Sequence, residues 1–268
     1  MMRRVSAVAM SVLLLGIPAG AEAQLVGAIS DEQEIEVGRE AAAVIEEDLA
    51  LLKDKVVVDY VNRLGQSLVV RSARPDITYT FKIVDTPDIN AFALPGGFIY
   101  VNRGLIEAAD NESELAGVMA HEIGHVVGRH GVDQMQRVQV VGVGLGVLEA
   151  ILGDGRVAGV GNVAAELVAS GTFLKFSRDA EREADRLGVV NVMAAGHAPG
   201  GMVTFFEKLD ALREGDPGAV EGFFASHPSP RERIENLSGV LDKVRKRFQT
   251  NSPEFRRVRA RLRSGKRK

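Results

Sequence analysis

The sequence predicts an α+β domain that is mostly helical, with a small antiparallel sheet beside one apolar helix. Three observations predict it. Apolar residues recur at helical spacing along most of the chain, apolar and polar residues alternate only near residues 77–101, and a His-Glu-x-x-His pattern lies within an apolar run. With 268 residues, 46% of them hydrophobic, the chain can form one large domain or two small ones around a real core.

The overall composition excludes several classes of function. The sequence has no cysteine, which rules out disulfides, thiolate metal sites and a cysteine nucleophile. Its formal net charge of −3 is not the basic balance typical of nucleic-acid binding, so we expect no nucleic-acid partner.

The N-terminal residues have the pattern of a secretory signal peptide. A short basic region with Arg3 and Arg4 precedes an apolar stretch at residues 5–17, and Ala21-Glu22-Ala23 fits a signal-peptidase site. An uncleaved membrane anchor is the alternative, but the apolar stretch is short for a span. We therefore expect residues 1–23 to be removed on export.

Two helices are expected before the sheet. Ser30 begins a capping box for a helix that reaches about Leu51, and a second helix follows from about Asp54 to Val70. Both have apolar stripes at helical spacing, which predicts packing against the core.

The expected sheet has three short strands. Residues 77–83 alternate in polarity, residues 91–94 are apolar and end at Pro95-Gly96-Gly97, and residues 98–101 form the third strand. A strand that ends in Pro and Gly is expected at a sheet edge, where it can pair with an extended peptide. An ordinary hairpin is the alternative.

The next helix, expected from about Asn111 to Arg129, carries His121-Glu122-Ile123-Gly124-His125. Residues four apart share one face of a helix, so both imidazoles can point at one metal ion, and imidazole nitrogen suits Zn²⁺. A carboxylate at Glu122 can take a proton from a water at that metal. The pattern also occurs without this chemistry, so a third ligand is required.

Two later segments offer candidates for that third ligand. His130 stands one residue short of the spacing of a longer zinc motif, so we reject it and expect a polar residue near a helix C-terminus. The helix expected from Ser177 to Ala195 carries Glu181 and Asp185 on one face. One carboxylate can bind the metal while the other accepts the ring N–H of a ligand histidine. Glu183 is expected about 200° round the helix from Glu181.

Residues 138–174 are rich in Gly, Ala and Val, and their uncharged run is too short to span a bilayer. They are expected to form a helical insertion. A mobile, lid-like hairpin over the site and a buried helical pair both stay open.

His227 stands just before a strong helix start at Ser229-Pro230. From there it can stabilise an oxyanion or act as an extra metal ligand, and the alternative is a histidine in a rigid turn.

The C-terminal segment, residues 251–268, is expected to be a solvated basic tail. From Arg256 to Lys268 it holds eight Lys or Arg and no acidic residue. Peripheral contact with an anionic membrane surface is a further use open to it.

Taken together, these motifs resemble the zinc metallopeptidases of the HtpX and CAAX-prenyl-endopeptidase type, in the gluzincin group. The resemblance covers roughly residues 30–245 and keeps the family order of four motifs. These are Asn90-Ala91-Phe92-Ala93-Leu94-Pro95-Gly96-Gly97, His121-Glu122-Ile123-Gly124-His125, Ser177-Arg178 with Glu181 and Asp185, and Ser226-His227-Pro228 with Arg233-Ile234.

More narrowly, the chain resembles the soluble exported bacterial branch of that family. We find no transmembrane segment apart from the signal, which makes prenyl-protein processing a poor fit. We also find no tetratricopeptide-like repeat of the kind that some exported relatives carry.

The resemblance implies a zincin-like metalloprotease domain over residues 24–250 with one Zn²⁺ per chain. It implies that His121, His125 and Glu181 bind the metal, that Glu122 is the general base and that Asp185 orients a ligand histidine. A second set of residues is expected to line the substrate cleft: Asn90, Ala91, Phe92, Ala93 and Leu94.

The resemblance also places His227 near the zinc, in catalysis or in autoinhibition. Arg233 is expected to contact the substrate, where it or His227 helps to hold the oxyanion.

The expected function is that of a zinc-dependent endopeptidase of the periplasm, acting on misfolded or misassembled envelope proteins bound in extended conformation. The rival hypothesis is an envelope chaperone or assembly factor with latent protease activity. A purely structural zinc site fits poorly, because structural sites are closed by four ligands and would leave Glu122 without a role.

Overall fold

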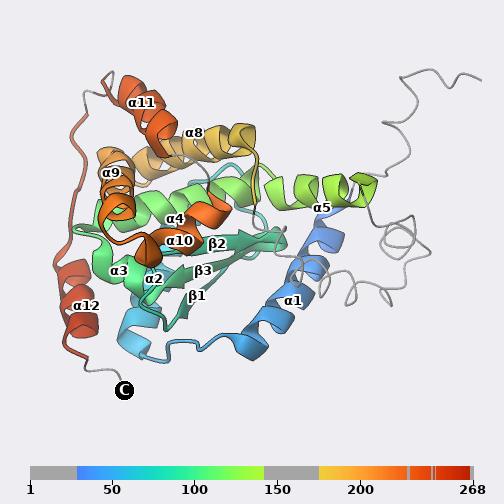
Figure 1. Ribbon diagram of the computed structural model, residues 1–268, viewed down its shortest axis with the longest axis horizontal. Helices are drawn as coiled ribbons and strands as arrows, with labels where there is room; N and C mark the ends of the chain where they lie inside the picture. The colour runs from blue at the N-terminus through green and yellow to red at the C-terminus, as the bar shows by residue number, and fades with distance from the viewer. Residues whose placement is uncertain (1–28, 142–174, 228–229, 243, 245, 266–268) are drawn as a thin grey trace, which may run out of the picture.

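The structure, a computed structural model, describes residues 29–141, 175–227, 230–242, 244 and 246–265. The expected signal peptide lies outside these ranges, and so do residues 142–174 of the insertion expected over residues 138–174; residues 138–141 belong to helix α5. Helices dominate the described chain, as predicted, and surround one small sheet (Figure 1). No helix within the described ranges is both long enough and apolar enough to cross a bilayer.

The helices are α1 Asp31–Asp48, α2 Lys55–Val69, α3 Arg103–Ala108, α4 Glu112–Val127, α5 His130–Val141, α8 Arg178–Ala194, α9 Gly200–Gly215, α10 Pro217–Ser226, α11 Pro230–Leu241 and α12 Pro253–Arg263. The strands are β1 Thr80–Val84, β2 Ala91–Leu94 and β3 Phe98–Asn102. Four of the helices, α3, α5, α10 and α12, are not among those expected from the sequence.

Local capping signals start the helices where the sequence predicts. Ser30 and Gln33 exchange backbone and side-chain hydrogen bonds in a capping box at the start of α1. The side chains of Asp54, Asn111 and Ser177 accept backbone N–H groups at the starts of α2, α4 and α8. The two helices that carry the candidate metal ligands are therefore positioned by their own N-terminal residues.

The sheet is mixed, not antiparallel as expected. Its strand order is β1-β3-β2, with β3 parallel to β1 and antiparallel to β2. The expectation assumed that successive strands are neighbours, but β3 is buried on both faces and takes the centre. Ile99 and Val101 pack in the main core with α4, and Tyr100 packs on the opposite side with α1. The expected edge position of β2 is confirmed.

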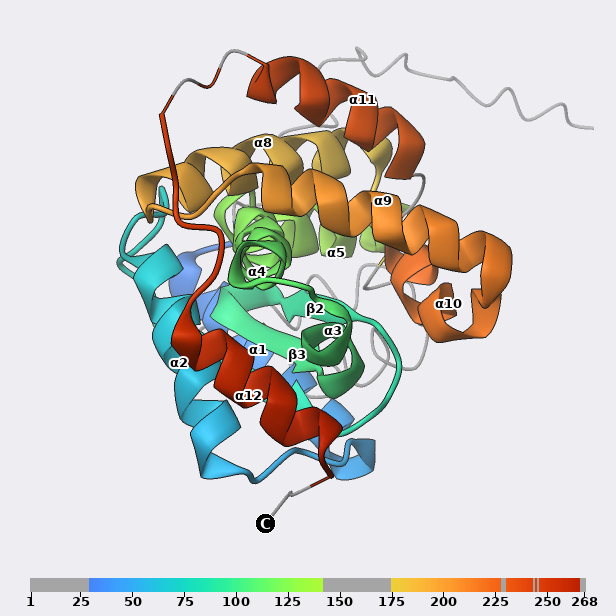
Figure 2. The same cartoon turned by 90° about the vertical axis from the view of Figure 1, so that its left-hand side faces the viewer.

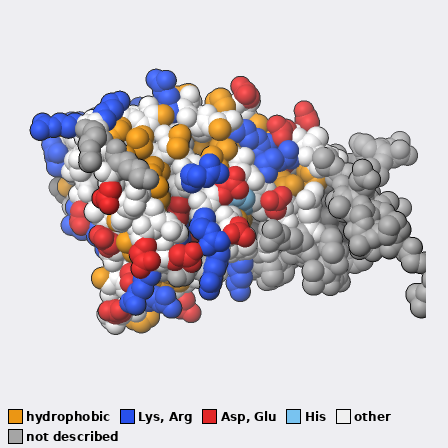
Figure 3. All heavy atoms as spheres, turned by 90° about the horizontal axis from the view of Figure 1, so that it is seen from above, with side chains coloured by type: hydrophobic (Ala, Val, Ile, Leu, Met, Phe, Trp, Pro, Cys, Tyr) orange, Lys and Arg blue, Asp and Glu red, His pale blue; other side chains and the backbone are white. Residues whose placement is uncertain are grey.

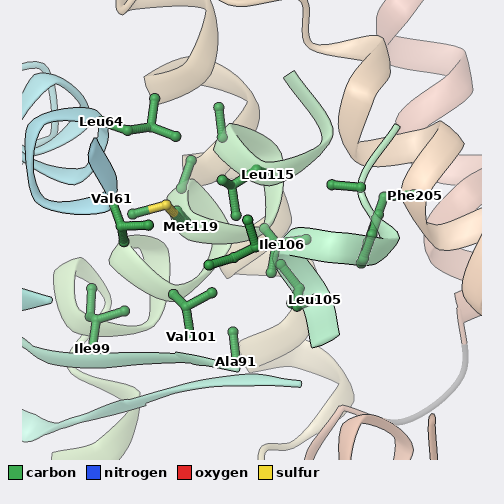
Figure 4. Packing of buried hydrophobic residues seen from close by; sticks show 14 of the residues in the cluster. Val61, Leu64, Ala91, Ile99, Val101, Leu105, Ile106, Leu115, Met119 and Phe205 are labelled. Carbon is green, nitrogen blue, oxygen red and sulfur yellow. The ribbon is translucent and has the colours of Figure 1, made fainter. Parts of the chain in front are cut away.

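Helix α4 runs through the middle of the molecule. Figure 2 shows it nearly end-on, with α8 and α9 on one side and the sheet and α2 on the other. In Figure 4, side chains of α2, β3, α3 and α4 meet in one cluster that includes Val61, Ile99, Leu105, Leu115 and Met119. The His-Glu-x-x-His segment is thus carried on a helix with almost no exposed face.

The expected basic tail is wrong for residues 253–263, which form α12 and pack against α2 and α3. A stripe of apolar side chains at helical spacing is buried there: Phe255, Val258 and Leu262. Arg259 pairs with Asp110 at 2.8 Å, and Arg261 pairs with Asp54 at 2.6 Å. The expectation of a tail rested on the number of basic residues and not on this apolar stripe. At least two of the basic side chains form ion pairs within the fold.

Candidate metal centre

Four buried side chains converge where α4, α8 and the end of α10 meet. His121, His125, Glu181 and His227 each offer one ligand atom, and these atoms all lie within 4.8 Å of one another. The Nε2 atoms of His121 and His125 are 3.0 Å apart, and Glu181 Oε1 lies 3.0 Å from His227 Nδ1. The structure therefore brings together the three ligands expected from the resemblance, with His227 as a fourth member.

The close crossing of α4 and α8 depends on a residue without a side chain. A Cβ atom at Gly124 would lie 2.7 Å from the carbonyl oxygen of Ala184. Because Gly124 lies inside the histidine motif, the backbone of α8 approaches α4 at the level of its two histidines. Glu181 and Asp185, one turn apart on α8, can then both reach the imidazoles.

The donor set fits a zinc ion. Imidazole nitrogens with one carboxylate are ligands that Zn²⁺ accepts. Both carboxylate oxygens of Glu122 and the Nε2 atom of His227 are buried with no hydrogen-bond partner among the described residues. Buried polar atoms without partners are rare in proteins, and a metal site with its water would give these atoms partners.

Asp185 holds His121 on the side away from the cluster. Its Oδ1 lies 2.9 Å from Nδ1 of His121, which leaves Nε2 of the ring facing the other ligand atoms. Arg233 on α11 donates to both oxygens of Asp185, at 2.7 Å from Nε and from Nη2. This placement matches the orienting role expected for Asp185.

Arg233, for which a substrate contact is expected, is buried beside the cluster. Its side chain is 3% exposed, and its Nη1 lies 2.7 Å from Glu181 Oε2. Its guanidinium also lies over the ring of Phe206, 4.2 Å from the centroid. The short spacing from His227 indicates that Arg233 lies near the site, but it does not indicate where its side chain points. In the structure, that side chain contacts the buried carboxylates of Asp185 and Glu181.

The two histidines of α4 experience different electrostatic environments. Burial and the charge of Arg233 oppose protonation of His121, but hydrogen bonds to Asp185 and Glu181 outweigh them and raise the pKa of His121 to about 9. Burial holds the pKa of His125 well below its usual range.

The two carboxylates of the cluster also differ. Burial raises the pKa of Glu122. Burial acts in the same direction on Glu181, but the neighbouring His227 and the two α4 histidines outweigh it and hold the pKa of Glu181 well below its usual range. The environment of the cluster thus favours the ionised form of Glu181 and the protonated form of Glu122. His227 Nε2 lies 3.5 Å from Glu122 Oε1.

The predicted substrate-lining residues lie on or just before the edge strand β2: Asn90, Ala91, Phe92, Ala93 and Leu94. Phe92 stacks on Tyr100 of the neighbouring strand, with ring centroids 4.9 Å apart. Ala93 and Leu94 line a small cavity together with His125 and Phe176. The C-terminal end of β2 therefore comes closest to the cluster.

Phe176, just before α8, is a residue of the site that sequence reasoning missed. Its ring stacks on His125 with centroids 3.9 Å apart and an interplanar angle of 19°. Its backbone N–H donates to the carbonyl of Ser226, next to His227. The cluster is closed as a result, since its four members are at most 1% exposed. A single Phe between Lys175 and Ser177 belongs to no pattern that would reveal this contact.

Comparison with known proteins gives a family match over more than half of the chain. A model of peptidase family M48 matches residues 57–241. The beta-barrel assembly-enhancing protease of Escherichia coli strain K12 is 30% identical over 241 residues, which are 87% of this chain and 49% of the relative. The mitochondrial metalloendopeptidase OMA1 of Schizosaccharomyces pombe is 30% identical over 192 residues, 72% of this chain and 55% of the relative.

Metalloprotease YcaL of Escherichia coli strain K12 is 31% identical over 165 residues, 59% of this chain and 60% of the relative. The chain spans about half the length of the beta-barrel assembly-enhancing proteases that it matches. The matched region contains the whole buried cluster and Glu122. The family resemblance drawn from the motifs is confirmed, and it supports the expected class, a metalloendopeptidase: the chain belongs to peptidase family M48.

Proposed function

We propose that this chain is a zinc-dependent endopeptidase of the bacterial periplasm that cleaves misfolded or misassembled envelope proteins. The observation that carries the proposal is the buried set of His121, His125 and Glu181, with the Glu122 carboxylate beside it making no hydrogen bond among the described residues. The names of relatives, a protease that enhances β-barrel assembly and a metalloendopeptidase, support this substrate class.

In this proposal, three residues hold the metal and a fourth transfers the proton. A zinc ion held by His121, His125 and Glu181 would supply Lewis-acid chemistry, acidifying a water and polarising the scissile carbonyl. Glu122 takes the proton from the attacking water and passes it to the leaving amine. Burial, which raises the pKa of Glu122, suits a group that must both accept and release a proton.

The edge strand supports a peptide substrate. β2 lies at the edge of the sheet, and its last residues come close to His125. A segment in extended conformation can add to such an edge through backbone hydrogen bonds, which requires no particular side chain. This mode of binding suits unfolded proteins of varied sequence.

His227 acts as a cap in this arrangement. Its Nδ1 lies among the ligand atoms, and its Nε2 faces the carboxylate of Glu122. A histidine in this position competes with water for the metal and crowds the general base, so it must move before catalysis. The catalytic alternative, in which His227 stabilises the oxyanion, predicts the opposite effect of removing it.

A second candidate function follows from the closed state of the site. His121, Glu122, His125, Glu181 and His227 are each at most 1% exposed. Such a site suits a chaperone or assembly factor whose proteolysis is latent. Complementation of a null strain by the Glu122→Gln variant separates the two, because full rescue favours the chaperone.

The direct test is zinc content together with cleavage of casein. Glu122→Gln should keep zinc and lose cleavage, and retained cleavage would contradict the mechanism. Glu181→Ala should lose zinc, and unchanged zinc content would show that another residue is the third ligand. His227→Ala should cleave faster than wild type if His227 is a cap, and slower if it is catalytic.

Contact with the membrane surface would rest on few charges. Of the arginines on α12, Arg259 and Arg261 are engaged in ion pairs, whereas Arg256 and Arg257 are exposed. On the face shown in Figure 3, basic and acidic side chains both occur. A weak, salt-sensitive association with anionic vesicles is the most that this distribution supports.

A further inference from the structure

We propose that His130 is a positioning residue that fixes the tautomer and ring orientation of His125. The inference rests on the proposed function, since it takes His125 to be a metal ligand. It gives a role to a residue that is too close in sequence to His125 for the longer zinc motif and that lies outside the group of ligand atoms.

The contact is direct and buried. Nδ1 of His130 lies 2.9 Å from Nδ1 of His125, and His130 is 4% exposed. The other ring nitrogen of His125, Nε2, lies 3.0 Å from Nε2 of His121 and 3.4 Å from Glu181 Oε1. The two nitrogens of His125 therefore have separate partners, the cluster on one side and His130 on the other.

The backbone between the two histidines is shaped for this contact. A Cβ atom at Gly128 would lie 2.5 Å from Nε2 of His130, so only glycine leaves room for the ring. Arg129 adopts φ +55°, and it is the sole non-glycine residue with positive φ in the described part of the chain. This left-handed residue separates α4 from α5 and turns His130 back towards His125.

The strained residue is held in place by its own side chain. Nη2 of Arg129 donates to the carbonyl of Ile29 at 2.6 Å, and its Nε lies 3.0 Å from Glu34 Oε2. Glu34 is 1% exposed. A left-handed conformation costs an L-residue about 1–2 kcal/mol, and such strain persists only where surrounding contacts enforce it.

The protons can be placed consistently along the chain of contacts. A histidine that binds a metal through Nε2 is neutral and carries its proton on Nδ1. Nδ1–H of His125 then donates to Nδ1 of His130, which must be unprotonated. The proton of His130 is therefore on Nε2, which lies 3.6 Å from Glu183 Oε2. That last contact is long, and Glu183 is half exposed, so it adds little.

The Nδ1 atoms of the two histidines of α4 are thus contacted by different residues, His121 by Asp185 of α8 and His125 by His130 of α5. Asp185 holds Nδ1 of His121 directly, and Glu183 approaches His130, which holds Nδ1 of His125. Glu183 was expected to point away from Glu181, and this direction takes it to His130. Hydrogen-bond partners of ligand histidines are known to affect metal affinity as well as ring orientation.

The matched pair His130→Asn and His130→Leu tests the inference. The two side chains have the same shape, but only Asn can offer an acceptor near the position of Nδ1. In the full chain, competition with a chelator should show zinc binding about 10–100-fold weaker in His130→Leu, and much closer to wild type in His130→Asn. Loss of packing alone would weaken both variants equally, and that result would overturn the inference.

A second measurement needs no variant. In the zinc-loaded wild type, ¹⁵N-detected NMR of the histidine rings should find a proton on Nδ1 of His125 and on Nε2 of His130. A proton on Nδ1 of His130, or zinc bound through Nδ1 of His125, would overturn the assignment. This readout decides the question even if a variant fails to fold.

Failure of the inference is distinguishable from failure of the proposed function. A wild-type chain that binds no zinc would overturn both. Tight zinc binding in the wild type and equally tight binding in folded His130→Leu would overturn only the role of His130.

Discussion

Helix α4 carries buried carboxylates near both ends, and they differ in their hydrogen bonding. At its N-terminal end, Glu112 accepts hydrogen bonds from Tyr60 at 2.9 Å, Ser252 at 2.8 Å and Gln249 at 3.0 Å. Three turns later, Glu122 is at least as buried, yet neither of its oxygens has a hydrogen-bond partner among the described residues.

Burial alone therefore does not identify a functional carboxylate, because buried carboxylates can also be fully hydrogen-bonded parts of the fold. Glu114, next to Glu112, accepts from Lys208 at 2.8 Å and from Thr204 at 3.1 Å, so it ties α9 to α4. These satisfied groups join elements distant in sequence and stabilise the fold. The unsatisfied group lies at the metal cluster, where polar capacity must be left free for water and substrate.

The largest expected effect is at the unsatisfied end. Glu122→Gln should reduce the rate of peptide hydrolysis about 10²–10⁴-fold, the usual contribution of a general base. The melting temperature should not fall, because no hydrogen bond to Glu122 is lost. Cleavage assays and thermal unfolding of the same sample measure both. A large drop in melting temperature would mean that Glu122 serves the fold after all.

Glu112→Ala should show the reverse pattern. Three donors would lose their acceptor at about 1 kcal/mol each, so we expect a loss of about 3 kcal/mol in unfolding free energy. Zinc content per folded chain should stay the same. Glu47→Ala, at an exposed position of α1, is the control and should change stability by less than about 0.5 kcal/mol. An equal loss of unfolding free energy in Glu112→Ala and Glu47→Ala would mean that the hydrogen bonds of Glu112 do not stabilise the fold.

Asp185 combines the two situations: it lies beside the buried cluster, as Glu122 does, but its oxygens have close partners, as those of Glu112 do. Burial alone would raise the pKa of Asp185, but Arg233 and His121 lower it to about 2, from the ordinary 3.8. A lowered pKa gives stability that is present above the ordinary value and is lost as pH falls through about 2. For this shift the contribution is about 2 kcal/mol.

Chemical unfolding of the metal-free protein across this range measures the contribution. The difference between wild type and Asp185→Asn should be constant from pH 7 down to about pH 4 and should shrink below that, as the carboxylate is protonated. A difference that stays constant down to pH 2 would mean that the charge of Asp185 does not stabilise the fold.

A further expected effect concerns the proton on His121. With a pKa of about 9, the metal-free protein holds a proton on His121 at neutral pH, and zinc must displace it. Zinc affinity should therefore rise about tenfold per pH unit between about pH 6 and pH 8, or about 1.4 kcal/mol per unit. Chelator competition at each pH measures the slope. Asp185→Asn removes a hydrogen bond that raises the pKa of His121. In this variant, the zinc affinity should therefore stop rising at a lower pH than in the wild type.

Much of the site could be predicted because it depends on short-range spacing. Residues four apart share a helix face whatever the rest of the fold, and this places His121 beside His125, and Glu181 beside Asp185. The caps Ser30, Asp54, Asn111 and Ser177 act within one turn, so the helix starts follow from local sequence.

What could not be predicted depends on contacts between distant segments or on one backbone angle. The order of the strands depends on which one is buried on both faces, and no spacing rule reports that. The direction of Arg233 depends on how α11 lies across α8. His130 is one residue away from a known pattern, and its role depends on the left-handed conformation of Arg129.

The packing of α12 has a consequence for the order in which the molecule can form. Phe255 lies beside Tyr60 of α2, and Glu254 pairs with Arg63 of the same helix. The core around α2 is therefore complete only when α12 has been made, although the residues of the metal cluster are synthesised earlier. Contacts between such distant segments form late and slowly. A nascent chain would therefore contain every residue of the buried cluster before the core around α2 is complete.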